Sequence, residues 1–354
     1  MKGRGATGNP RNRFEPLHYT PDPEASSGPG PHTQFLHDRT RTIITTNDSP
    51  DVPFDTSVNP YRGCEHGCTY CFARPNHEYL GFSAGLDFET RILVKNDAPE
   101  LLRAELSDRR WRPQPVAMSG VTDPYQPIER HLRITRRCLE VLADTCNPVA
   151  IITKSALVAR DGDVLGEMAR WNGAVVYLSI TTLDADLGRA MEPRAATPER
   201  RLEAIRDLTA AGVPVGVLVA PVIPGLTDHE LPAILTAAAE AGADTAGYIP
   251  LRLPWGVGGL FSDWLETHCP DRKEKVLHRI ESIREGSLND PRFGSRMRGA
   301  GPFAEQIRNL FELGRRQAGL ETGHRTLDSG HFRAPSSAQI RLFDSPRPGG
   351  PGRQ

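Results

Sequence analysis

The sequence lacks an excess of charge of either sign. Its 354 residues include 43 lysines and arginines against 44 aspartates and glutamates, which gives a formal net charge of −1. This balance excludes a generally basic coat for nucleic acid, and it excludes strong long-range attraction of polyanions. Any attraction of nucleic acid would therefore have to come from a local basic patch.

Long apolar runs are missing as well. No stretch approaches the roughly 18 consecutive apolar residues of a membrane-spanning helix, and the first residues, MKGRGATGNPRNRFEP, contain no apolar core of a signal peptide. We therefore expect a cytoplasmic protein without a membrane partner. Only six cysteines occur, and in a reducing compartment they serve as metal ligands, reactive groups or buried side chains rather than as disulfides.

The central part of the chain, residues 43–270, alternates short apolar runs with stretches of helical spacing. The apolar runs predict strands at Val116–Ser119, Val149–Thr153, Ala174–Thr181, Val213–Ala220 and Thr245–Leu251. Apolar residues at i, i+3 and i+4 predict helices over Arg130–Ala143, Ala156–Trp171, Pro198–Ala211 and Asp228–Ala241. This alternation indicates βαβ units around a parallel sheet. A barrel is favoured over a doubly wound open sheet because the glycine-rich phosphate turn of the latter is missing.

The two ends of the chain have a different composition. Residues 1–42 are rich in Pro, Gly and Ser, and the first fourteen carry four basic and no acidic residues, so we expect a flexible basic arm. Residues 271–343 predict a helical extension, in which a helix over 300–313 is expected to cover the open side of the barrel. Residues 344–354 predict a disordered tail.

The most informative motif consists of Cys64, Cys68 and Cys71, spaced as C-x3-C-x2-C. Three thiolates can converge on one inorganic centre when Gly63 and Gly67 let the loop bend, and they leave one coordination position open for catalysis. The motif follows a predicted strand at 54–59, at the end where barrel enzymes place their active sites. The alternative is a zinc-stabilised binding module without catalysis, with His66 or His77 as the fourth ligand.

This motif resembles that of the radical S-adenosylmethionine (radical SAM) superfamily, with Tyr70 in the aromatic position before the third cysteine. The resemblance implies an α/β fold, a partial (β/α)6 barrel of the TIM type. It implies that the three cysteines hold a [4Fe–4S] cluster and that S-adenosylmethionine binds the fourth iron. It further implies reductive cleavage to a 5′-deoxyadenosyl radical, with an electron donor such as flavodoxin or ferredoxin as partner.

The resemblance also implies which other residues contact the cofactor. Ser119, Gly120 and Asp123, at the end of the second strand, are expected near the methionine amine. Lys154 and Ser179, at the ends of the third and fourth strands, are expected to touch the cofactor as well. The alternative interpretation is structural: a turn built by Asp-Pro, a surface lysine and a helix-capping serine.

Within the superfamily, residues 51–254 resemble the spore photoproduct lyase-like branch, often labelled "DNA repair photolyase". The segments NPYRGCEHGCTYCFARPNHEYLG, TDPYQPIE, ITKS and VAPVIPGLTD carry this resemblance. It implies damaged or modified DNA as substrate, and a protein or small-molecule substrate is the alternative. The lyase has a hydrogen-donating cysteine after the second strand, and residues 118–123 contain none here. Tyr125 is therefore the predicted alternative hydrogen donor.

Two further segments bear on partners. Gln339–Phe343 (QIRLF) resembles the short peptide with which bacterial replication and repair proteins dock on the DNA sliding clamp, although the tail could instead fold back on the barrel. Residues 284–316 carry seven arginines and four acidic residues, which predicts either a phosphate-facing patch or a helix with many ion pairs.

Overall fold

The computed structural model describes residues 3–15 and 32–335. The predicted clamp-binding peptide Gln339–Phe343 and the tail 344–354 lie outside these ranges. Among the described residues, no helix is long and apolar enough to cross a membrane.

An eight-stranded sheet in the order β11-β10-β9-β8-β7-β6-β3-β2 forms the centre of the molecule. Its strands are β2 (Ile44–Thr46), β3 (Thr56–Val58), β6 (Val116–Met118), β7 (Val149–Thr153), β8 (Ala174–Ser179), β9 (Val215–Val222), β10 (Thr245–Pro250) and β11 (Glu321–Thr322). The six strands from β3 to β10 pair in parallel, and β2 pairs with β3 in the antiparallel sense. Because β2 and β11 do not pair with each other, the barrel is open, and the predicted six-stranded parallel fold is confirmed.

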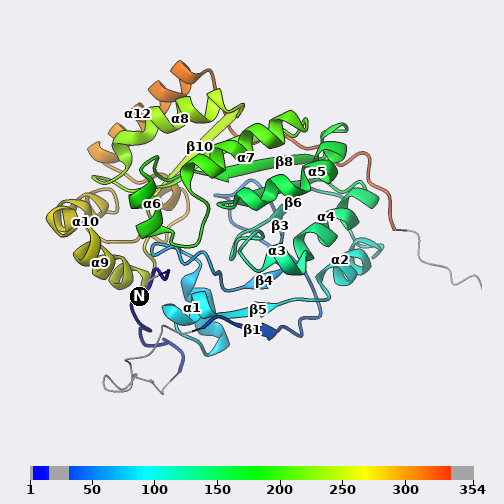
Figure 1. The fold of residues 1–354 in the computed structure, drawn as a ribbon, viewed down its shortest axis with the longest axis horizontal. Helices are drawn as coiled ribbons and strands as arrows, with labels where there is room; N and C mark the ends of the chain where they lie inside the picture. The colour runs from blue at the N-terminus through cyan, green and yellow to red at the C-terminus, as the bar shows by residue number, and fades with distance from the viewer. Residues whose placement is uncertain (1–2, 16–31, 336–354) are drawn as a thin grey trace, which may run out of the picture.

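Helices between the parallel strands cover the outer face of this sheet (Figure 1). They include α4 (Ile134–Asp144), α5 (Gly162–Ala169), α6 (Ala185–Met191), α7 (Pro198–Ala210) and α8 (Leu231–Glu240). Three predicted helices are divided at their start into a short turn and a longer helix. The first parts are the short helix α3 (Glu129–Leu132) and the 3-10 helices η2 (Ala156–Asp161) and η3 (Asp228–Glu230). In the first case Arg133 adopts φ 52°, which ends one helix and turns the chain into the next.

A second, three-stranded sheet in the order β1-β5-β4 lies beside the barrel (Figure 1). It contains β1 (Gln34–His37), β4 (Tyr61–Arg62) and β5 (Arg91–Val94), and it is accompanied by η1 (Arg74–Leu80), α1 (Leu86–Thr90) and α2 (Ala98–Leu106). The chain leaves β3, crosses to this sheet as β4, and then enters the cysteine loop. The small sheet therefore holds the start of that loop.

The described parts of residues 1–42, predicted from their composition to be a flexible arm, make specific contacts with the rest of the chain. The carboxylate of Glu89 accepts hydrogen bonds from the backbone amides of Gly5 (3.0 Å) and Ala6 (2.8 Å), and β1 pairs with β5. A Cβ atom on Gly5 would lie 1.7 Å from the carbonyl oxygen of Gly67, so only glycine allows this approach. Composition could not reveal the contacts with Glu89, because Glu89 lies 84 residues after Gly5 in the chain.

The C-terminal extension is helical, as predicted, with α9 (Val257–His268), η4 (Pro270–Arg272), α10 (Lys273–Ser282), α11 (Ser295–Arg298) and α12 (Pro302–Ala318). Helix α12 packs against α8, and Phe311 contacts Tyr248 of β10 at 4.6 Å between ring centres. It therefore lies at the β10 margin of the opening rather than across it. The segment around α11 makes the crossing contact instead, because Arg296 pairs with Asp51 at 2.5 Å. Several arginines of this region are thus ion-paired rather than free.

Candidate functional site

The cysteine loop follows β4 at the carboxyl edge of the parallel sheet. Gly63 and Gly67 adopt φ 78° and 70°, and the turns they allow bring the three cysteines to one side of the loop. Cys64 and Cys68 are 7% and 8% exposed, and Cys71 is half-buried. Burial and then the proximity of Cys64 raise the pKa of Cys71, and both pack against Ala73 and Phe88. The structure therefore places the three predicted ligands on one largely buried loop, and their binding of a cluster stays a prediction.

A buried guanidinium holds the shape of this loop. Arg74 donates hydrogen bonds to the carbonyl oxygens of Cys68 (2.9 Å) and Gly67 (3.1 Å). It also bonds the carbonyls of Ala84 and Gly85 and pairs with Glu89 at 2.5 Å, and the side chains of both ions are fully buried. One ion pair therefore connects the cysteine loop, α1 and the N-terminal segment. No spacing in the sequence singled out these two residues.

The loop after β6 forms hydrogen bonds with the cysteine loop. Thr122 donates its hydroxyl hydrogen to the carbonyl of Gly63 (2.6 Å), and Gln126 bonds that same carbonyl (3.3 Å) as well as the amide of Glu65 (3.0 Å). Ser119 and Gly120, which the resemblance placed at the cofactor amine, lie at the start of this loop. They have positive φ values of 154° and 127° and are half-buried.

Asp123 joins β6 to β7. Its carboxylate accepts hydrogen bonds from the Thr153 hydroxyl (2.7 Å) and the Lys154 amide (2.8 Å), and it lies 3.4 Å from His66 Nδ1. Burial alone would raise the pKa of Asp123, but His66 and these donors lower it to about 2. The structure supports the turn-building role of Asp123, and its contact with the cofactor amine stays a prediction.

Glu192 is a site residue that the sequence did not resolve. Its buried carboxylate accepts hydrogen bonds from the Tyr70 hydroxyl, from Arg201 and from Thr181 (2.8 Å). Burial and then the charge of Glu192 raise the pKa of Cys68, which places this anion beside the cysteine loop. The sequence shows only an acidic residue in the segment 192–194, and such a residue is as typical of an exposed corner as of a binding site.

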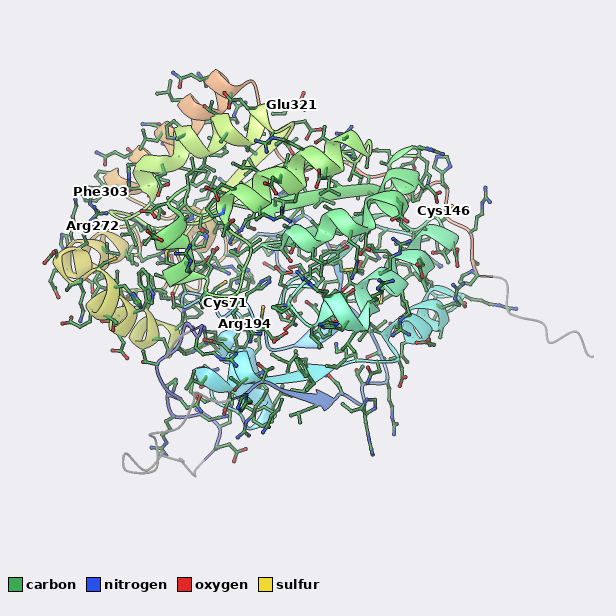
Figure 2. The ribbon with its side chains drawn as sticks, in the orientation of Figure 1. Cys71, Cys146, Arg194, Arg272, Phe303 and Glu321 are labelled. Carbon is green, nitrogen blue, oxygen red and sulfur yellow. The ribbon has the colours of Figure 1, made fainter. Side chains whose placement is uncertain are left out.

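The same segment contacts the cysteine loop through Arg194. Its guanidinium pairs with Glu65 at 3.1 Å, and its amide donates to the carbonyl of His66 at 3.2 Å. In the view of Figure 2, Arg194 and Cys71 both project onto the region between the parallel sheet and the small sheet. The turn after α6 therefore forms one wall of the site.

Lys154 and Ser179 end neighbouring strands, as predicted. The ammonium group of Lys154 donates to the carbonyl of Ala220 at 3.1 Å and lies 5.9 Å from the ring centre of Tyr70. The backbone carbonyl of Ser179 accepts a bond from Arg201 at 2.8 Å, and its hydroxyl has no hydrogen-bond partner within the described ranges. Both therefore lie at the carboxyl edge near Tyr70, and their contact with the cofactor stays a prediction.

Tyr125 is not brought to the cysteines. Its ring is fully buried in the main core, and its hydroxyl donates to Asp161 at 3.0 Å. Arg160 pairs with Asp161 and with Glu129, so the phenol belongs to a network on the helical side of the sheet. The structure gives the Tyr125 hydroxyl a structural partner in Asp161, and its role as a hydrogen donor stays a prediction.

The donor set fits an iron–sulfur cluster better than a single zinc ion. Over residues 3–15 and 32–335, no three His, Cys, Asp or Glu side chains gather closely enough to hold one ion. His66 is engaged with Asp123, and His77 packs against Phe82 and Phe88. Three thiols spread around one loop suit a polynuclear centre. The buried Thr69 hydroxyl of this loop has no partner among the described residues, and a bound group could satisfy it.

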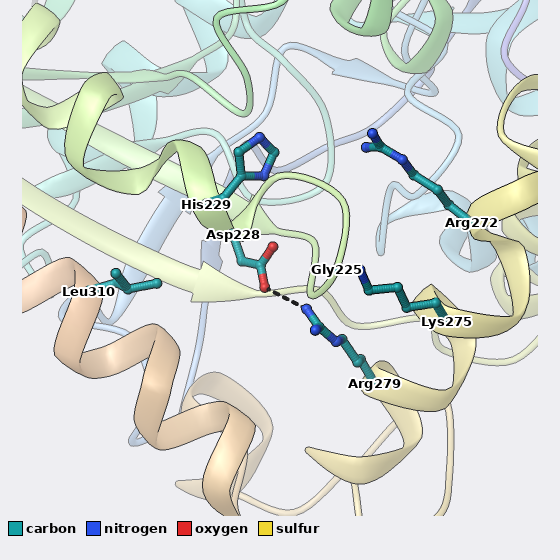
Figure 3. A pocket seen from close by; sticks show the side chains of 7 residues that line it. All are labelled: Gly225, Asp228, His229, Arg272, Lys275, Arg279 and Leu310. Atoms are coloured by element: carbon teal, nitrogen blue, oxygen red, sulfur yellow. Dashed lines mark hydrogen bonds and ion pairs between the residues drawn. The ribbon is translucent and has the colours of Figure 1, made fainter.

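A cavity of about 390 Å³ lies on the outer side of the loop between β9 and α8 (Figure 3). Arg279 pairs with Asp228 at 3.4 Å there, and Arg272 and Lys275 have no side-chain partner in the described part of the chain. The cavity is lined by Gly225, Asp228, His229, Arg272, Lys275, Arg279 and Leu310. None of these is a predicted site residue, so this basic cavity is separate from the cysteine loop.

Comparison with known proteins places this geometry in a wider context. Residues 58–238 match the profile of the family described as the Radical SAM superfamily. An uncharacterized protein of Mycobacterium tuberculosis is 38% identical over 249 residues, which cover 70% of this chain and 72% of the relative. An uncharacterized protein of Methanocaldococcus jannaschii is 30% identical over 173 residues, which cover 49% of this chain and 62% of the relative.

Solved structures show the same fold. A variant of spore photoproduct lyase with bound AdoMet and dinucleoside spore photoproduct superposes with a TM-score of 0.60 and covers 82% of both chains. The sequences are 17% identical, so the likeness concerns the fold. The predicted partial barrel is therefore confirmed by an independent structure as well as by strand order.

Proposed function

This chain belongs to the radical SAM superfamily, and from that premise we propose that it cleaves S-adenosylmethionine reductively to attack damaged or modified DNA. The family implies a [4Fe–4S] cluster and S-adenosylmethionine as cofactors. When bound, they supply one electron and the C–S bond whose cleavage gives a 5′-deoxyadenosyl radical. The observation that carries the proposal is the position of Cys64, Cys68 and Cys71 on one largely buried loop at the carboxyl edge of the barrel.

The residues around the cysteines would position the cofactors and exclude water. Arg74 fixes the backbone of the loop through four carbonyl oxygens. Tyr70 is held by its hydrogen bond to Glu192, and Lys154 lies over its ring. The burial of Cys64 and Cys68 keeps solvent from the centre, which protects a reactive radical from side reactions.

The loop also reaches the surface, where an electron donor would have to dock. Cys71 is half-buried, and the next residue, Phe72, is exposed. We propose a flavodoxin or ferredoxin as this electron donor, in keeping with a cytoplasmic enzyme.

The DNA substrate rests on the branch resemblance and on the shared fold. Among the solved structures of this fold, spore photoproduct lyase is seen with a dinucleoside spore photoproduct. This chain has no cysteine in residues 118–123, and its Tyr125 is buried, so the lyase's route of hydrogen return is not proposed for it.

The C-terminal peptide Gln339–Phe343 is proposed to dock on the DNA sliding clamp. The sequence offers Leu342 and Phe343 as apolar anchors and Gln339 as a hydrogen-bonding side chain. A clamp pull-down that captures the wild type and not the Leu342→Ala/Phe343→Ala variant would support this. Equal capture of both would exclude it.

Anaerobic reconstitution with iron and sulfide tests the proposed chemistry. We expect a brown protein with about four irons per chain, and release of 5′-deoxyadenosine after addition of dithionite and S-adenosylmethionine. Cys68→Ala should lose both signals. The matched control is Cys146→Ala, since Cys146 is half-buried in a loop away from the motif and its loss should change neither. A full iron content in Cys68→Ala would refute the ligand assignment.

A further inference from the structure

A set of four exposed aromatic side chains and two arginines, joined in two contact groups, lies on the segments next to the cysteine loop, after β10 and near the N-terminus. We call it the aromatic–arginine surface, and it consists of Arg13, Phe14, Phe72, Tyr79, Arg252 and Trp255. The exposed fractions of the aromatic side chains are 53% for Phe14, 49% for Phe72, 69% for Tyr79 and 64% for Trp255. Half of the eight large apolar side chains that are exposed in the described ranges therefore belong to this surface.

The six residues come from three distant segments and contact one another in pairs. The Arg252 guanidinium lies 4.9 Å from the ring centre of Phe72, and that of Arg13 lies 4.1 Å from Trp255. Phe14 stacks on Tyr79 with ring centres 4.8 Å apart. Phe72 lies just before η1 and Tyr79 lies in its last turn. Arg252 and Trp255 follow β10. The surface therefore begins next to Cys71 at the carboxyl edge of the barrel.

The backbone conformation of Trp255 favours a role in ligand binding for its exposed ring. Trp255 has a φ of 47°, the left-handed region that bulky residues avoid because the side chain crowds the backbone. An exposed ring gains little from burial to offset that strain. Strained residues that persist are concentrated at binding and catalytic sites, which points to a ligand for the outer face of this ring.

The charge of the surface is also incompletely neutralised. Arg13 pairs with Glu78, but the Arg252 side chain has neither an ion pair nor a hydrogen bond in the part of the chain that the structure describes. Burial and then the neighbouring Arg296 lower the pKa of Arg252, because both disfavour its charge. Asp51, which pairs with Arg296, offsets part of this repulsion, and a negatively charged ligand would give Arg252 a direct partner.

We infer that the aromatic–arginine surface binds unpaired bases of single-stranded or locally opened nucleic acid. Every base has a π face that can stack on an exposed ring, while arginines at the rim attract the phosphate backbone. In an intact duplex the bases are stacked on each other and cannot offer those faces. The inference rests on the proposed function, since it names the substrate class for the same site.

Binding of a labelled oligonucleotide by the full-length, cluster-loaded protein tests the inference, measured by fluorescence anisotropy without reductant or S-adenosylmethionine. We expect a fifteen-nucleotide single strand to bind about tenfold or more tightly than the duplex of the same sequence. Trp255→Ala should weaken binding of the single strand about five- to tenfold, and Trp255→Phe should retain most of it. Phe72→Ala should also weaken it, with iron content as the check that the cysteine loop is intact.

Phe35→Ala is the matched control, since Phe35 is 45% exposed on β1 and no arginine within residues 3–15 and 32–335 lies over its ring. It should bind as the wild type does. Equal binding by Trp255→Ala and Phe35→Ala would overturn the inference, as would equal affinity for duplex and single strand. Binding of neither DNA form would also overturn it and would leave the surface to a peptide ligand. Release of 5′-deoxyadenosine is measured separately, so a failure of the proposed chemistry is distinguishable from a failure of this inference.

Discussion

The ion pair between Arg74 and Glu89 offers the sharpest test of how the cysteine loop is held. Both side chains have no exposed area, and they lie 2.5 Å apart. We choose Arg74→Met, which keeps a long apolar side chain and removes the guanidinium. The change leaves the Glu89 carboxylate with the amide donors Gly5 and Ala6 and the nearby charge of Arg4. It removes one donor from each of four carbonyl oxygens, of which that of Cys68 keeps the Cys71 amide.

The size of the effect follows from this inventory. Removing one partner of a buried ion pair costs about 3–5 kcal/mol, because the other charge stays buried and uncompensated. The two amide donors to Glu89 place the expected value toward the lower end. Even so, about 3 kcal/mol is a large part of the 5–15 kcal/mol that stabilises a typical protein. We therefore expect lower stability and a cysteine loop too mobile to retain iron.

The assay is urea unfolding of the iron-free chain, followed by iron determination after reconstitution. Arg110→Met is the matched control, because Arg110 and Asp108 form an equally direct ion pair whose side chains are 90% and 38% exposed. Such a surface pair contributes little to stability, because solvent screens both charges. If Arg74→Met unfolds at the same urea concentration as Arg110→Met and binds as much iron, the proposed role of the buried pair is wrong.

Three further predictions concern other parts of the structure. Tyr125→Phe removes the hydrogen bond to Asp161 and should lower the free energy of unfolding by about 1 kcal/mol without changing 5′-deoxyadenosine release; an unchanged free energy of unfolding would contradict this. Gly225→Ala should destabilise by about 1–2 kcal/mol, because φ is 81° and the new Cβ would lie 3.0 Å from Arg279 Cδ; unchanged urea unfolding would contradict this. Burial lowers the pKa of His77 to about 4, so between pH 6.5 and 4 only the unfolded chain gains its proton. The free energy of unfolding of the wild type should therefore fall by up to about 3 kcal/mol relative to that of His77→Phe over this interval. Parallel pH profiles of the two proteins in urea titrations would contradict this prediction.

Much of the barrel was predictable because its signals are local. The apolar run at Val149–Thr153 coincides with β7, and the run predicted at Val213–Ala220 is shifted by two residues to give β9. A strand buried on both faces has to be apolar throughout, and a helix on one face has to repeat its apolar residues every turn. The division of the helix at Arg133 was not predictable, since a single left-handed residue interrupts an otherwise regular apolar pattern.

The candidate site was predictable only where its residues are close together in the chain. The three cysteines and the bends at Gly63 and Gly67 lie within one loop, so their spacing alone indicated a shared metal centre. The side chains that position the cysteines come from segments far apart in the chain. Tyr70 and Glu192 are 122 residues apart, and Gly5 and Glu89 are 84 residues apart. No periodicity relates such positions.

The sequence by itself thus determined the parallel order of strands and helices, the set of three thiols and the family to which the chain belongs. Only the tertiary structure decided which polar groups surround those thiols, and it turned Tyr125 away from them into a core network. It also laid the N-terminal segment against the cysteine loop. The physical reason is that composition and spacing record which face of an element is buried, whereas the pairing of buried charges depends on how distant elements pack.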